Sequence, residues 1–280
     1  MIVMDTNQIK EMILAEGIDL VGITDAKNLL LAKPPRPATA LMPSAKSVIV
    51  MAVAHSLGAA FAPYIKIWTR NKMQTSRLLD QVAEKIGRYL EQNGFLSMPI
   101  SADKPVEIYK LDPQTGKKLI HTRTLGHFSL KHAAVSAGLG ELGWSNLLLT
   151  PQFGPHQRLG AIITAAPLEP DTPLDISLCT KCKSCEKACP VGALKDGKYD
   201  CDKCYSYWSK GFKQVYPEKF RDWPKYLRLL WENNQTRDVF IEMSQNYITD
   251  VDYCIECMKA CPVGTQWEKV RPKLMKMNKK

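Results

Sequence analysis

The spacing of the cysteines constrains this chain more than any other feature of its sequence. All nine cysteines of the 280 residues lie between Cys179 and Cys261. The first four follow the pattern Cys-x2-Cys-x2-Cys-x3-Cys-Pro, ending at Pro190. In this pattern three thiolates wrap one cubane [4Fe–4S] cluster, and the cysteine before the proline points to a second cluster. The sequence therefore predicts two [4Fe–4S] clusters in the C-terminal third.

A second, shorter run, Cys-x2-Cys-x3-Cys-Pro, ends at Pro262 and supplies three of the four ligands of a complete site. The missing ligand must be Cys201 or Cys204, so one thiol is spare. By ferredoxin logic, one cluster is held by Cys179, Cys182, Cys185 and Cys261. The other is held by Cys189, Cys254, Cys257 and either Cys204 or Cys201.

Two zinc sites, or a set of ordinary buried cysteines, are the alternatives for these residues. Zinc usually uses paired Cys-x2-Cys knuckles and has no need for two Cys-Pro terminations. We expect a protein of the cytoplasm, where the reducing conditions keep thiols free. Nine cysteines in such a protein indicate metal or redox chemistry rather than disulfides. We therefore expect iron–sulfur binding, which establishes an electron conduit but not what the electrons reach.

The bulk composition indicates a compact globular protein of the cytoplasm. Hydrophobic residues make up 45% of the chain, and no apolar run approaches the roughly 20 residues that cross a bilayer. The N-terminal residues lack the order of a signal peptide, and we expect no membrane association. The formal charge is +10, but six of the last twelve residues are basic, which favours a solvated tail. Binding of nucleic acid such as tRNA stays an alternative that rests on charge alone.

Strands and helices alternate along the first 170 residues. Periodicity predicts helices at 5–16, 75–92 and 127–138, the second stopped by Gly94, and strands at 18–24, 47–55, 106–111, 119–124, 147–150 and 159–168. The composition changes at 167–175, which divides the chain into domains 1–170 and 171–280. The second domain holds the cysteines, helical stretches near 217–231 and 236–246, and a basic tail.

Three glycines, Gly138, Gly140 and Gly143, fit the spacing of a dinucleotide-binding fingerprint. That fingerprint follows a strand and opens a helix, whereas here a helix precedes it and a strand follows, so we do not expect a nicotinamide cofactor. Glycines let a backbone lie close to a flat cofactor or to a neighbouring strand. Taken alone, the segment is best interpreted as a tight turn.

The segment AGLGELGWSNLLLTPQFGPHQRLGAIIT at 137–164, followed by the first cysteine run, resembles the cobalamin-dependent iron–sulfur reductases. This group contains epoxyqueuosine reductase and the reductive dehalogenases. AEGIDLVGIT, LMPSAKSVIVMAVAH and CYSY at 204–207 also resemble the group, so the similarity covers nearly the whole chain. One departure is that HTRTLGHFSL at 121–130 lacks the acidic proton donor of epoxyqueuosine reductases, with Thr124 nearest by count.

The resemblance implies an α+β fold with a nitroreductase-like α/β core that binds a corrinoid, and a C-terminal bacterial ferredoxin-like domain with two [4Fe–4S] clusters. It favours Cys204 over Cys201 as the eighth ligand. It also implies that nine residues lie near the corrinoid: Gly138, Leu139, Gly140, Gly143, Trp144, Asn146, Phe153, Gly154 and Arg158.

The function implied is that of an oxidoreductase that passes electrons from the clusters to a corrinoid, for reductive cleavage of a carbon–heteroatom bond. We expect a small or nucleoside-like substrate and an external low-potential electron donor. Such a reaction needs a nearby acid. The polar candidates are Tyr109, His121, His127, His132, His156 and Arg158, of which we prefer His127 and Arg158. The alternative is a ferredoxin-like electron-transfer protein that reduces a partner enzyme or corrinoid protein.

Overall fold

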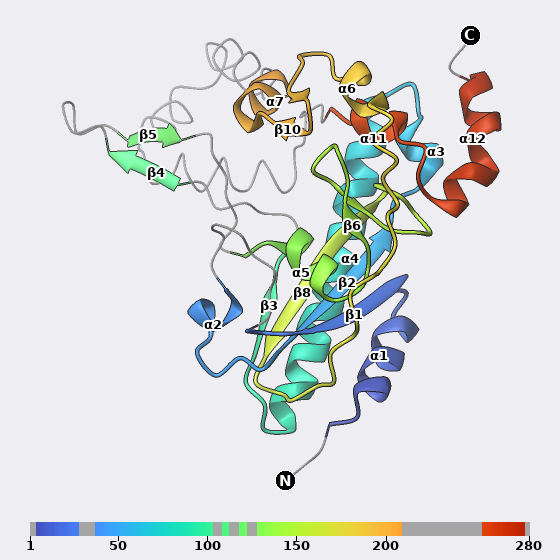
Figure 1. Cartoon of the computed structure of the whole chain (residues 1–280). Coiled ribbons are helices and arrows are strands. Elements are labelled where there is room, and N and C mark those ends of the chain that lie inside the picture. The colour runs from blue at the N-terminus through green and yellow to red at the C-terminus, as the bar shows by residue number, and fades with distance from the viewer. Residues whose placement is uncertain are drawn as a thin grey trace, which may run out of the picture.

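The central element of the fold is a four-stranded antiparallel sheet in the order β1-β2-β8-β3 (Figure 1). A computed structural model describes residues 4–27, 37–102, 108–111, 118–121, 128–208 and 254–277. The strands of the sheet are β1 (Leu20–Asp25), β2 (Ser47–Ala54), β8 (Gln157–Thr164) and β3 (Ser97–Ile100). Three of them confirm predicted strands, whereas the short edge strand β3 has no sequence signal that we used.

The continuous apolar run of β2 is explained by burial on both faces of the sheet. Val48, Val50 and Ala52 pack in the core under one face. Ile49 and Met51 alternate with them and pack in the core under the other face. Because successive side chains of a strand point to opposite faces, a strand covered on both sides is apolar at every position. The sheet is therefore the middle of three layers.

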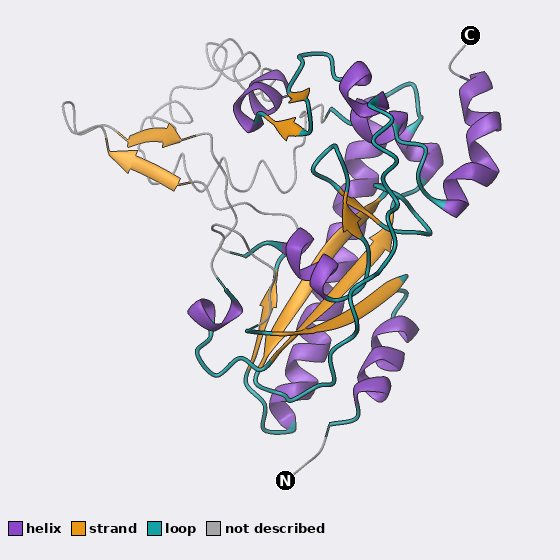
Figure 2. Cartoon of the chain, in the orientation of Figure 1, coloured by secondary structure: helices purple, strands orange, loops and turns teal. Residues whose placement is uncertain are grey.

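Helices α1 (Thr6–Ala15) and α4 (Ile65–Gln92) cover one face of the sheet, and α5 (Leu130–Ser136) covers the other (Figure 2). The predicted helix at 75–92 begins ten residues earlier, at Ile65. Its first turns bury Trp68, Thr69 and Lys72, and two of these three residues are polar, which hid the start of the helix. Gly94 adopts φ +87°, a conformation that glycine adopts readily, and this confirms the predicted end.

Several short elements surround the sheet. They are α2 (Ala38–Leu41), α3 (Leu57–Ala60), the antiparallel pair β4 (Ile108–Leu111) and β5 (Lys118–His121), and the hairpin β6 (Glu141–Leu142) and β7 (Leu148–Leu149). The pair β4–β5 confirms the strands predicted around 106–111 and 119–124. The predicted helices near 217–231 and 236–246 lie outside the described residues, as do Thr124 and His127.

The cysteine-bearing segments lie beyond one end of the sheet (Figure 1). They form α6 (Ser184–Ala188), β9 (Leu194–Lys195), β10 (Lys198–Tyr199), α7 (Cys201–Trp208) and α11 (Glu256–Ala260). Helix α12 (Thr265–Met277) occupies most of the stretch that we expected to be a solvated tail. Its Trp267 is fully buried and stacks on Phe61, with ring centroids 4.8 Å apart.

The segment 263–266, directly after the second cysteine run, is fixed against the turn at 151–154 by backbone contacts. The N–H groups of Thr265 and Gln266 donate to the carbonyls of Pro151 and Gln152, both at 3.0 Å. At Gly154, a Cβ would lie 1.9 Å from the carbonyl oxygen of Val263. The two parts of the chain therefore pack as closely as two strands. Among the described residues, no helix is long and apolar enough to cross a membrane.

Candidate functional site

Four thiols from two separate runs form the first set of cysteines. Helices α6 and α11 are in contact and bring the runs together. The pKa of the Cys261 thiol is raised to about 11, mainly by burial and also by the neighbouring thiols of Cys179, Cys185 and Cys182. The same four side chains line one small cavity together with Trp144 and Leu149. They are the four cysteines that the ferredoxin arrangement assigns to one cluster.

The second set consists of Cys189, Cys204, Cys254 and Cys257. Burial raises the pKa of Cys257 to about 12, and the thiols of Cys254, Cys204 and Cys189 add to this shift. All four line a cavity of about 220 Å³. A smaller contribution to the Cys257 shift comes from Cys185, so the two sets of thiols are adjacent.

Cys204 and Cys201 occupy different positions at the second set. Cys204 lines the cavity, and its pKa is raised by burial and by the thiols of Cys254 and Cys189. Cys201 does not line the cavity. Its charge interacts with the ammonium of Lys131 and opposes the lowering of the Lys131 pKa by burial. The hydroxyl of Tyr199 interacts with both thiols. This geometry favours Cys204 as the eighth ligand.

The spacing of the thiols also bears on the kind of metal. Within the described ranges, no three His, Cys, Asp or Glu side chains converge closely enough to hold a single metal ion. A structural zinc ion needs four ligands, with Zn–S distances of about 2.3 Å. Four thiols spread around a cavity are the arrangement expected for a cluster, in which each thiolate binds a different iron atom.

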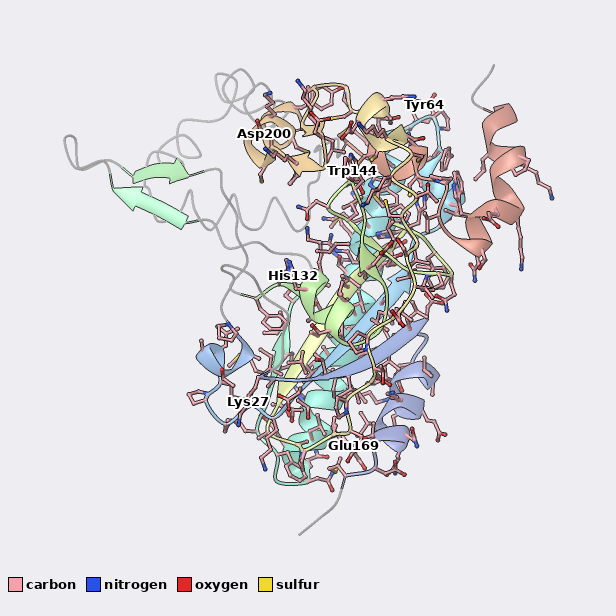
Figure 3. The ribbon with its side chains drawn as sticks, in the orientation of Figure 1. Lys27, Tyr64, His132, Trp144, Glu169 and Asp200 are labelled. Atoms are coloured by element: carbon pink, nitrogen blue, oxygen red, sulfur yellow. The ribbon has the colours of Figure 1, made fainter. Side chains whose placement is uncertain are left out.

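The hairpin β6–β7 of the first domain holds the first ligand of the first set. The carboxylate of Glu141 accepts hydrogen bonds from the N–H groups of Leu178, at 2.6 Å, and Cys179. The N–H of Trp144 donates to the Cys179 Sγ at 3.3 Å, and its indole N–H donates to Glu186 (Figure 3). These contacts fix the Cys179 loop and place a hydrogen-bond donor on its sulfur. Sequence reasoning missed Glu141, although a charged residue between turn glycines was a usable signal.

The glycines of the predicted corrinoid segment are explained by contacts within the chain. A Cβ at Gly140 would lie 2.0 Å from the carbonyl oxygen of Leu149, and one at Gly143 would lie 2.5 Å from the Leu149 side chain. Gly138 has φ +72°, and its Cβ would lie 2.4 Å from the carbonyl oxygen of Thr172. Backbone atoms of neighbouring segments leave no room for a Cβ at Gly138 and Gly140, and at Gly143 the Leu149 side chain would have to move.

The other residues of this group do not lie together. Leu139 is buried in the core on the α5 side of the sheet. Arg158 lies on the α4 side, where its Nε donates to the Ser76 hydroxyl at 3.2 Å. Phe153 is buried. Asn146 alone of the nine lines the 220 Å³ cavity, beside Lys131, whose Nζ donates to the Asn146 carbonyl at 2.7 Å.

Of the histidine candidates, the side chains of His156 and His132 are described. His156 is 1% exposed, and neither of its ring nitrogens has a hydrogen-bond partner within the described residues. Burial lowers its pKa to about 4. The Nδ1 of His132 lies 2.7 Å from the Ser129 hydroxyl, close to the start of α5. For Tyr109 and His121 only the strand backbone is described, and His127 lies outside the described residues.

Comparison with known proteins identifies the first cysteine run and relates the chain to two groups of reductases. A family model described as a 4Fe-4S binding domain matches residues 172–195. The chain is 30% identical over 193 residues to an epoxyqueuosine reductase from Bacillus cereus, covering 65% of this chain and 44% of that protein. It is 34% identical over 96 residues to a tetrachloroethene reductive dehalogenase from Sulfurospirillum multivorans, covering 27% of this chain and 19% of the relative.

Solved structures of both groups share the fold. A selenomethionine-labelled epoxyqueuosine reductase matches with a TM-score of 0.58 and 20% identity, covering 91% of this chain and 64% of that one. A reductive dehalogenase described in connection with B12-dependent dehalogenation matches with a TM-score of 0.57 and 19% identity, covering 97% of this chain and 35% of that one. The chain spans less than half the length of the curated relatives that it matches.

Proposed function

We propose that this relative of the epoxyqueuosine reductases and reductive dehalogenases is an iron–sulfur reductase with two [4Fe–4S] clusters and a corrinoid. The observation that carries the proposal is the grouping of eight cysteines into two sets of four, each around its own cavity. Cys179, Cys182, Cys185 and Cys261 would bind one cluster. Cys189, Cys204, Cys254 and Cys257 would bind the other, and Cys201 is spare.

We also propose that residues 1–170 form a nitroreductase-like core and that residues 171–280 form a ferredoxin-like domain with two clusters. The layered arrangement of the sheet and the position of the cysteines beyond its end support this division. The close packing of Gly154 on Val263 supports a direct contact between the two parts.

The cavity of the second set supports a corrinoid next to that cluster. It is lined both by cysteines and by residues of the first domain, including Lys131, Asn146 and Leu147. Bound beside the cluster, against Lys131 and Asn146 and outside the space that the cluster fills, a corrinoid would supply a cobalt centre for reductive cleavage of a carbon–heteroatom bond. Asn146 would contact it. Burial lowers the pKa of Lys131, whose Nζ donates to the carbonyl of Asn146 at this cavity. The expected substrate is small or nucleoside-like.

One observation favours a second candidate, an electron-transfer protein without a corrinoid. The glycines of the 138–143 segment are fully explained by packing against Leu149 and Thr172, so they do not require a flat cofactor. Such a protein would pass electrons from its clusters to a partner enzyme or corrinoid protein and would turn over no small molecule.

Metal analysis of the protein purified anaerobically with cobalamin supplied separates the candidates. About eight irons and about one cobalt per chain would support the reductase, whereas about eight irons without cobalt would support the electron-transfer protein. Stoichiometric zinc without iron would refute both. The matched variants Cys204→Ala and Cys201→Ala test the ligand set. We expect the first to lose about four irons and the second to keep all of them.

A further inference from the structure

We propose that electrons enter this protein at the first set of thiols, through a basic surface around Cys182 that docks a small acidic one-electron carrier protein. The inference rests on the proposed iron–sulfur function and adds the site and the chemistry of the donor. We call this surface the Cys182 face. It consists of Cys182 and five exposed lysines: Lys181 and Lys183 of the same loop, Lys187 of α6, and Lys195 and Lys198 of the β9–β10 hairpin.

Exposure marks the first set as the point of entry. All nine cysteines are described, and Cys182 alone is exposed. The cavity of the second set, in contrast, is lined by Lys131, Asn146 and Leu147 of the first domain. A donor protein can therefore approach the first cluster through the exposed Cys182, whereas no thiol of the second set is fully exposed. One electron would pass from the reduced donor to the cluster held by Cys182 and its three partners, and no bond forms or breaks.

Contacts join the separate lysines into one face. Trp144 connects them, because the Lys183 ammonium lies 5.9 Å from the indole centroid and Gly197 of the β9–β10 hairpin packs on the same ring. Lys183 also lies 3.8 Å from Asp196 at the tip of that hairpin. The hairpin that carries Lys195 and Lys198 is thus fixed beside the Cys182 loop, and Trp144 lies in the cysteine-bearing part of the molecule (Figure 3).

The positions of these lysines are unfavourable for the fold itself. Lys181 and Lys183 have φ values of +54° and +59°, in the left-handed region, where a residue with a Cβ is strained. Lys195 and Lys198 are directly opposed across the hairpin, and like charges in that arrangement are destabilising. Lysines at such positions are more simply explained by a role at the surface than by a contribution to stability.

The acidic groups near the face are Glu186, Asp196 and Asp200, fewer than its five lysines, and the cluster with its four thiolates would add about two negative charges, so the positive charge is carried by the ammonium groups around Cys182 rather than by the net charge of the face. The carboxylate of Glu186 accepts hydrogen bonds from the indole N–H of Trp144 and the N–H of Gly197, which lower its pKa and keep it charged. Asp196 faces Lys183 only at 3.8 Å, with both side chains more than half exposed. Lysine side chains around an exposed cluster ligand attract a negatively charged protein. They accelerate its approach and orient it on the cluster. An acidic carrier protein is the occupant that fits.

The test is the rate at which a reduced plant-type [2Fe–2S] ferredoxin, a small acidic protein, reduces the anaerobic holoprotein. We expect the second-order rate constant to fall steeply as salt is added. The variant Lys181→Glu/Lys183→Glu should lower it at least about tenfold at low salt and flatten its salt dependence. The control Lys27→Glu/Lys46→Glu makes the same change of charge at exposed positions elsewhere, with Lys27 far from Trp144 (Figure 3), and should change the rate less than about twofold.

A second variant and a second reductant separate loss of docking from loss of folding. Lys195→Gln/Lys198→Gln removes charge without touching the strained loop, and it should lower the ferredoxin rate even if the first variant folds poorly. Reduction by methyl viologen, a small cation, should not be slowed in any of these variants. Equal losses in the control and the face variants, or a loss with methyl viologen as large as with ferredoxin, would overturn the docking proposal. The iron content decides the proposed function separately.

Discussion

Replacing Gly154 by alanine tests the contact that joins the second cysteine run to the first domain. Gly154 has φ +56°, and a Cβ there would lie 1.9 Å from the carbonyl oxygen of Val263, which is backbone and cannot rotate away. Alanine in this conformation costs about 1–2 kcal/mol by itself. Relieving the overlap requires the turn at Gly154 to separate from the start of α12.

The cost of that separation can be worked out from the hydrogen bonds that cross it. The N–H groups of Thr265 and Gln266 donate to Pro151 and Gln152 at 3.0 Å, and each bond contributes about 0.5–1.5 kcal/mol. With the backbone strain, Gly154→Ala should lower the free energy of unfolding by about 4 kcal/mol, a large part of the stability of a typical domain. Because Cys254, Cys257 and Cys261 lie on the displaced run, both clusters should also lose iron.

Gly17→Ala is the matched control. Gly17 also has positive φ, +86°, but nothing lies within 4 Å of the position of its Cβ. This variant should therefore lose only about 1 kcal/mol and keep its iron. The assay is urea unfolding of the anaerobic proteins, followed by far-UV circular dichroism, with iron determined on the same samples. The reasoning is refuted if the two variants are equally stable and hold equal amounts of iron.

Three further predictions follow from other contacts. Glu141→Ala removes the acceptor of two backbone N–H groups at the Cys179 loop, so we expect the free energy of unfolding to fall by about 2–3 kcal/mol. Because a negative charge disappears, the reduction potential of the first cluster should also rise. An unchanged potential in an EPR-monitored redox titration would contradict this. Trp267→Ala empties a fully buried site and should cost about 3–5 kcal/mol in urea unfolding, whereas alanine at the neighbouring exposed Gln266 should cost well under 1 kcal/mol. Burial, followed by the charges of Arg158, His156 and Lys72, lowers the pKa of His55 from 6.5 to about 3. The unfolded chain therefore binds the extra proton below pH 6.5, so this contribution to stability is complete above 6.5 and falls by up to about 1.4 kcal/mol per pH unit towards pH 3. His55→Gln should make the urea midpoint less dependent on pH between about 7 and 5, and an equal pH dependence in both proteins would show that His55 is not the titrating group.

Local patterns predicted the elements of the sheet well because burial on two faces leaves a clear trace in the sequence. The run from Ser47 to Ala54 is apolar at nearly every position, and the structure covers both of its faces. Patterns failed where tertiary contacts replace local signals. The start of α4 buries Thr69 and Lys72, which read as exposed residues, and the strand at Ser97–Ile100 is defined only by its pairing with β8.

The glycine segment shows the limit of sequence reasoning at the site itself. Its spacing indicates only that the backbone must lie close to something. The structure identifies a protein neighbour for each glycine, Thr172 for Gly138 and Leu149 for Gly140 and Gly143. It also places Trp144 and Glu141 on the Cys179 loop, where neither was expected to act. Whether Arg158 acts in the reaction stays a prediction, since its described contacts lie on the α4 side of the sheet.

The sequence by itself determined the cluster chemistry, because ligand spacing in a short run is set by covalent geometry and needs no tertiary information. It therefore divided eight thiols into two sets but left Cys201 and Cys204 unresolved from spacing alone. Only the tertiary structure decided which of these thiols faces the cavity, and which of the nine cysteines is exposed. The first depends on segments as far apart in sequence as Lys131 and Cys257 lining one cavity, and such an arrangement arises from packing rather than from local pattern.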